Sequence, residues 1–96
     1  MSRIRVRDLL EGGGRDCRPM SRAEGKRLTA ALRGARGAIE LDFAGIEVIG
    51  PSFADEVFRV FAASNSQVQL VPVNMAAEVA SMVRRVDRAI ASAISR

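Results

Sequence analysis

Histidine is absent from this chain of 96 residues, and cysteine occurs only once, as Cys17. Without His, the chain lacks the side chain that enzymes use most often as a general base and that proteins use most often to bind metals. A single Cys excludes an internal disulfide and, with no His present, a zinc site built from these two residue types. We therefore expect no catalytic residues, no metal site and a cytoplasmic location.

Trp and Tyr are absent as well, so Phe alone supplies the aromatic content of 4%. The core must be largely aliphatic, and a platform for stacking nucleic-acid bases would have to use Phe or Arg. No apolar run approaches the roughly 20 residues of a membrane helix, so no membrane association is expected. The consecutive Gly residues at positions 12–14 lack the spacing of a phosphate-binding loop, so no cofactor is expected. Length and a hydrophobic content of 48% fit a single domain over residues 1–96.

The net charge of +4 is unevenly distributed along the chain. Residues 1–37 hold ten basic and four acidic side chains, which gives +6. Residues 38–83 hold one basic and six acidic side chains, which gives −5, and residues 84–96 return to +3 with four basic and one acidic. The two basic ends make a nucleic-acid-binding accessory protein an alternative function, because Arg binds phosphates well. The acidic middle and the lack of a known nucleic-acid-binding motif argue against it.

Hydrophobic periodicity predicts the element order β-α-β-α-β-α, and hence a small α/β domain with a mixed, mostly parallel sheet and helices packed on it. The first strand is predicted from the alternation of Ile4 and Val6 and its continuation to Leu9 or Leu10, and its Arg residues suit a sheet edge. The first helix is predicted over residues 21–33, because Ser21 and Glu24 form a capping-box pattern.

The second half of the chain is predicted to hold two strands and two helices. Strands are expected at 38–43 and 67–73, and Pro51 opens the helix between them after a loop that packs down on the core. Asn74 is expected to be the N-cap of the last helix, which would run from about residue 76 nearly to the end of the chain. Its long apolar stripe is compatible with a homodimer and consists of Val79, Met82, Val83, Val86, Ile90 and Ile94.

Residues 39–61 combine a strand, a short loop and the start of a helix. Loops beyond the carboxyl ends of parallel strands are where open α/β sheets place ligand sites, and helix N-termini carry unpaired N–H groups. Asp55 and Glu56 are adjacent, so they would point about 100° apart on a helix and form a poor catalytic pair. Geometry therefore favours a binding edge over an active site.

This unit resembles the STAS domains of anti-sigma-factor antagonists, in which an Asp-Ser-Ser-Gly-Leu loop carries a Ser phosphorylated by a kinase of the GHKL ATPase type. The chain resembles more closely a bacterial STAS-like family of unknown function. The resemblance covers nearly the whole chain and rests on Ser-Arg-Ala-Glu-Gly at 21–25, Asp-Phe-Ala-Gly-Ile at 42–46, Phe-Ala-Asp-Glu at 53–56, Asn74, and Arg84 with Arg85.

The resemblance implies a non-enzymatic regulatory module that binds another protein, such as a GHKL-type ATPase or a transcription regulator. The docking surface would be residues 50–59 with the neighbouring basic helix at 21–33. The chain departs from the STAS pattern because only one Ser of the loop remains, so Ser52 is either a phospho-acceptor or simply a residue suited to a helix start. The expected partner-binding residues are Gly50, Pro51, Ser52, Asp55, Glu56 and Arg59.

Overall fold

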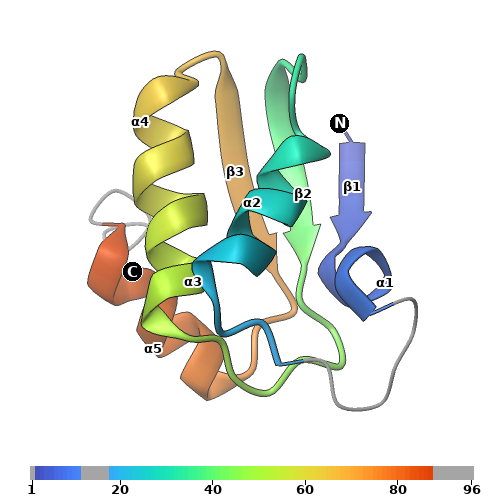
Figure 1. Ribbon diagram of the computed structural model, residues 1–96. Coiled ribbons are helices and arrows are strands. Elements are labelled where there is room, and N and C mark those ends of the chain that lie inside the picture. The colour runs from blue at the N-terminus through green and yellow to red at the C-terminus, as the bar shows by residue number, and fades with distance from the viewer. Residues whose placement is uncertain (1, 12–17, 88–96) are drawn as a thin grey trace.

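The computed structural model describes residues 2–11 and 18–87 (Figure 1). Three strands form one sheet in the order β1-β2-β3, and both neighbouring pairs are parallel. The expected small α/β domain is confirmed, and the described strands form a parallel sheet without an antiparallel member. The elements are β1 (Ser2–Arg5), α1 (Val6–Glu11), α2 (Arg22–Ala30), β2 (Gly37–Asp42), α3 (Pro51–Ala54), η1 (Asp55–Phe61), α4 (Ala62–Ser64), β3 (Val68–Val73) and α5 (Ala77–Val86).

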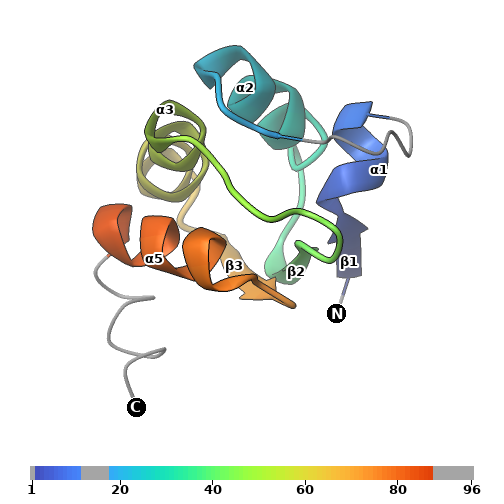
Figure 2. The same cartoon turned by 90° about the horizontal axis from the view of Figure 1, so that it is seen from below.

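The helices that connect the strands lie on one side of the sheet. Figure 2 shows α2 and α3 on the same side, with α5 next to α3. This arrangement follows from the strand order, because successive right-handed crossovers that advance in one direction place their helices on the same face. Among the described strands the order does not reverse, so they form no switch point of the kind at which open α/β folds place their ligand crevice. A binding site must therefore be sought in the helical layer and in the loops that lead into it.

The core fills the space between the sheet and these helices. Ile39, Leu41 and Phe43, which alternate along the predicted strand at 38–43, are all buried. Ile46 and Ile49 in the following loop are also buried, so the prediction that this loop packs on the core is confirmed. All four Phe residues of the chain are buried, at Phe43, Phe53, Phe58 and Phe61.

The predicted first strand is wrong beyond Arg5. At Val6 the chain turns into α1, whose buried face is formed by Val6 and Leu10, while Leu9 remains 37% exposed. The spacing between Val6 and Leu10 fits one face of a helix as well as it fits one face of a strand, so alternation over so short a segment could not separate the two. The strand itself lies at an edge of the sheet, as expected from its Arg residues.

The predicted last helix is also wrong in length and in its cap. It ends at Val86, and Asp87 is extended, with φ −125° and ψ 101°. Its N-cap is Ala76 rather than Asn74, whose backbone is left-handed with φ 55° and whose side chain donates a hydrogen bond to Asp42. Ile90 and Ile94, which carried the homodimer argument, lie outside the described residues, as do Cys17 and the Gly run at 12–14.

Gly50 marks the tightest backbone packing around the loop before α3. Its N–H donates to the carbonyl oxygen of Pro19 over 2.8 Å. A Cβ at this position would lie 2.5 Å from the carbonyl oxygen of Met20 and 2.8 Å from its Cα. The φ of −86° and ψ of 160° suit any residue, so the position requires Gly for space and not for conformation. The segment before α2 thereby fixes the entrance to α3.

We predict that Gly50→Ala destabilises the protein through this contact. Because the clash is with backbone, the free energy of unfolding should fall by about 3 kcal/mol, as measured by urea denaturation. Gly34→Ala is the matched control: its Cβ would meet nothing within 4 Å, but its φ of +79° is strained for Ala. That strain should cost only about 1 kcal/mol. A larger loss of stability for Gly34→Ala than for Gly50→Ala would contradict the prediction, because it would show that residues 18–20 move easily to make room for the added Cβ.

Candidate functional site

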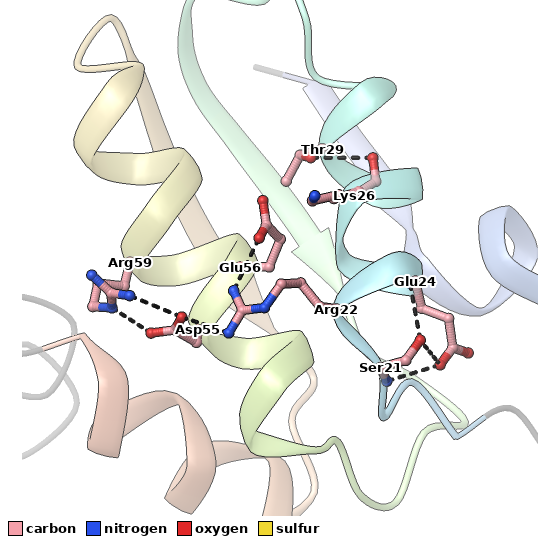
Figure 3. A network of polar contacts seen from close by, with 8 residues as sticks. All are labelled: Ser21, Arg22, Glu24, Lys26, Thr29, Asp55, Glu56 and Arg59. Carbon is pink, nitrogen blue, oxygen red and sulfur yellow. Dashed lines mark hydrogen bonds and ion pairs between the residues drawn. The ribbon is translucent and has the colours of Figure 1, made fainter.

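A network of ion pairs joins α2 to η1. The Arg22 guanidinium lies 3.1 Å from Asp55 Oδ2 and 3.0 Å from Glu56 Oε1, so one side chain binds both acids (Figure 3). Asp55 is also bound by Arg59, whose Nη2 donates to Oδ2 over 3.0 Å. Arg22 was not among the six named partner-binding residues, although it belongs to the basic helix at 21–33 that was predicted to adjoin them.

The two helices approach closely because Gly25 has no side chain. A Cβ at Gly25 would lie 2.8 Å from Glu56 Cβ and 3.2 Å from the carbonyl oxygen of Phe53. Glu56 is only 8% exposed, so this predicted partner-binding residue lies in the contact between helices and not on the outer surface. Its carboxylate reaches Arg22 at the rim of that contact.

Two segments that carried the family resemblance therefore meet in space. In the first, Ser21 is the N-cap of α2: its Oγ accepts from the Glu24 N–H over 3.1 Å, and the Ser21 N–H donates to Glu24 Oε1 over 3.0 Å. The predicted capping box is confirmed. Arg22 and Gly25 of the same segment then contact Glu56 of the second. Much of the Ser-Arg-Ala-Glu-Gly and Phe-Ala-Asp-Glu pattern thus has a structural role, which is to hold α2 against η1.

The helix that begins at Pro51 contains a π-helical segment. Residues 55–61 form η1, and the right-handed helical backbone at Ala54, Asp55 and Ala62 makes α3, η1 and α4 continuous. π segments within α-helices frequently occur at functional sites. Here the segment carries Asp55, Glu56 and Arg59, so every group of the network except Arg22 belongs to it.

The exposed part of the predicted site is the start of this helix together with Arg59. Gly50 is buried, whereas Pro51 and Ser52 are exposed on the first turn. Met20, whose backbone packs on Gly50, is 47% exposed and is one of two large hydrophobic side chains exposed in the described part of the chain. Sequence reasoning missed Met20, since nothing in its local pattern shows that residues 18–20 lie against residue 50. We use the name docking edge for Met20, Pro51, Ser52, Asp55 and Arg59.

Asp42 ties together the carboxyl ends of two strands. Its Oδ1 accepts from the Ala44 N–H over 2.9 Å and from Asn74 Nδ2 over 3.0 Å, and Arg3 lies 3.6 Å from Oδ2. The hydrogen bond from Asn74, and then that from Ala44, hold the pKa of Asp42 below its ordinary value. Asp42 therefore orients the loop after β2.

The Asp55 carboxylate in the docking edge is likewise held in its charged form. The hydrogen bond from Arg59, and secondly that from Arg22, lower the pKa of Asp55. Within residues 2–11 and 18–87, no group of three Cys, Asp or Glu side chains is arranged to hold a metal ion. No helix in the same ranges is long and apolar enough to cross a membrane.

We predict that Arg22 contributes more to stability than Arg59. Arg22→Met keeps an apolar stem but leaves the buried Glu56 carboxylate without its cation, and an unpaired buried charge is destabilising. In Arg59→Met, Asp55 still pairs with Arg22. The urea midpoint should therefore fall further in Arg22→Met. Adding Glu56→Met to Arg22→Met should restore part of the loss, because no unpaired charge remains. Equal midpoints for the two single variants would contradict the network.

We predict that Asp42 makes part of the stability dependent on pH. Because its folded pKa lies below the ordinary value of 3.8, its carboxylate stabilises the fold above that value. That stabilisation disappears as the pH falls through the folded pKa. Asp42→Asn keeps an acceptor oxygen, so wild type should exceed it in urea midpoint at about pH 7 but not at about pH 2. Asp55 titrates in both proteins, so the comparison isolates Asp42. The same difference at both pH values would refute this role.

The comparison with protein families agrees with the resemblance seen in the sequence. The family model described as a STAS-like domain of unknown function (DUF4325) matches residues 24–80. These residues include Gly25, Asp42, Asp55, Glu56 and Asn74, which make the contacts described above. No curated protein and no solved structure matches the chain significantly. Because the family model covers more than half of the 96 residues, the chain belongs to the family of STAS-like domains of unknown function.

Proposed function

We propose that this domain is a non-enzymatic regulatory module that binds a partner protein through the docking edge. The observation that carries the proposal is the combination of an exposed Met20 with the exposed Pro51 and Ser52, next to the tight backbone packing of Gly50 on residues 19 and 20. Ser52, Asp55 and Arg59 follow at helical spacing, so they continue the edge along one face. A surface that is already ordered loses little conformational freedom when it binds, which favours recognition of another folded surface.

The state of the acidic side chains supports a binding role over a catalytic one. A general acid or base needs a titratable group within reach of a substrate and with a pKa near the working pH. Asp42 and Asp55 accept hydrogen bonds from neighbouring donors, which lower the pKa of each. Glu56 is buried against Arg22. With His absent from the chain, the docking edge offers no group suited to this chemistry.

The lack of exposed aromatic rings and the pairing of several Arg residues favour a protein partner over nucleic acid. Trp and Tyr are absent and all four Phe residues are buried, so the chain presents no aromatic ring on which bases could stack. Arg3, Arg22 and Arg59 are paired with carboxylates of the same chain. Their charges are therefore partly neutralised before any phosphate approaches.

The family resemblance suggests a GHKL-type ATPase or a transcription regulator as the partner. Ser52 lies in the docking edge itself, where a phosphate added by such an ATPase would place negative charge on the first turn of the helix. Phosphorylation would then change the surface that the partner contacts. If Ser52 is not modified, its exposed position still makes it a contact residue.

We predict that changes to the docking edge weaken binding of a GHKL-type ATPase, with candidates for the assay taken from the neighbouring genes. Met20→Glu combined with Ser52→Glu alters exposed side chains only, so the fold should persist while affinity measured by biolayer interferometry falls by about tenfold or more. Arg84→Glu on α5 is the control, because Arg84 is exposed and lies outside the edge. Unchanged affinity in the double variant, or an equal loss in the control, would contradict the proposed surface.

A further inference from the structure

A groove opens between α2 and the helix formed by η1 and α4. The two helices touch at Gly25 and Glu56, and beyond this contact they diverge (Figure 1). The space left between them has a volume of about 370 Å³. Ligand pockets in proteins usually measure about 300–1,000 Å³, so the groove is large enough for a small organic molecule. It lies on the far side of the Arg22 network from the start of α3.

The charges in this groove are not balanced. Lys26 on α2 and Arg33 in the turn that follows both line it, and neither forms an ion pair with a described residue. Glu56 also lines the groove, but Arg22 already neutralises its carboxylate. Figure 3 shows Lys26 and Glu56 on the facing helices. The groove therefore holds two positive charges without a counter-charge, in contrast to Arg22 and Arg59 close by.

The remaining lining combines apolar and polar groups in a way that suits a ligand with two parts. Val60 and Phe61 supply an apolar wall, and Ser64 adds a hydroxyl group. Asn65 is fixed in place because its Nδ2 donates to the carbonyl oxygen of Phe61 over 2.9 Å. A lining of this kind can hold a small apolar body while Lys26 and Arg33 hold an anionic group.

We propose that this groove binds a small organic anion, which carries a carboxylate or phosphate group on an apolar body. The anionic group would lie between Lys26 and Arg33, and the apolar body would contact Val60 and Phe61. Charge-assisted hydrogen bonds from two cations supply much of the affinity, because both cations are otherwise without a partner among the described residues. This site is separate from the docking edge and does not rest on the function proposed for that edge.

The test uses phenyl phosphate and benzoate as probes in an NMR titration of the ¹⁵N-labelled chain. We expect saturable shifts of amide signals from residues 29–33 and 60–65, with the stronger probe identifying the preferred anionic group. Benzyl alcohol lacks the charge and inorganic phosphate lacks the apolar body, so each should bind at least about tenfold more weakly. Each variant is judged to be folded if its amide signals outside the groove match those of the wild type.

Variants distinguish specific binding in the groove from a general attraction of anions to a basic protein. Lys26→Ala with Arg33→Ala should weaken the better probe by about tenfold or more. Arg84→Ala with Arg85→Ala removes the same charge from exposed positions of α5 and should leave affinity unchanged. Ser64→Phe should fill the groove without changing the charge of the chain. It should therefore abolish the shifts that the probes cause.

Four results would overturn the proposal. The first is the absence of saturable shifts with either probe up to about 10 mM. The second is equal weakening by the two double variants, and the third is equal binding of inorganic phosphate and phenyl phosphate. The fourth is tighter binding of a hexaglutamate peptide with shifts that extend along α2 beyond the groove, since this would identify a surface for an acidic protein segment.

Discussion

The rest of the helical layer depends on the contact between Gly25 and Glu56, in which Arg22 forms an ion pair with Glu56. A missing side chain on one helix lets the other approach until its Glu56 is buried, and a guanidinium from the first helix then neutralises that carboxylate. Removing Arg22 would leave a buried charge without a partner, and adding a side chain at Gly25 would force it against Glu56. Close approach and charge pairing therefore reinforce each other at one point.

Two surfaces form on opposite sides of this contact. Towards the start of α3, the docking edge combines Met20 with the exposed first turn of the helix. Towards α4, the helices diverge and leave the groove with Lys26 and Arg33. The sheet contributes to both only indirectly, because the strand order β1-β2-β3 creates no crevice at its carboxyl end. Asp42 and Asn74 close that end by bonding to each other.

Features that depend on local pattern could be predicted from the sequence. The strands β2 and β3, the capping box of Ser21 and Glu24, and the entry of Pro51 into a helix all follow from short-range signals. The family could be recognised as well, because its motifs are contiguous segments.

Features that depend on distant residues could not be predicted. Asn74 resembles an N-cap locally, yet its side chain binds Asp42, which lies 32 positions away. Glu56 resembles a surface acid until Gly25 and Arg22 are placed against it. The π segment also left no signal, since its apolar spacing over seven residues is compatible with an α-helix. Met20 became part of the docking edge only through its contact with Gly50.

The central claim is that the contact at Gly25 holds α2 and η1 together as one unit. Hydrogen–deuterium exchange of the Gly25→Ala variant tests it directly, because the added Cβ must push Glu56 away. The account predicts that amides of α2 and of η1 exchange faster together, while amides of β2 keep their protection. Faster exchange in α2 alone, with η1 unchanged, would contradict it.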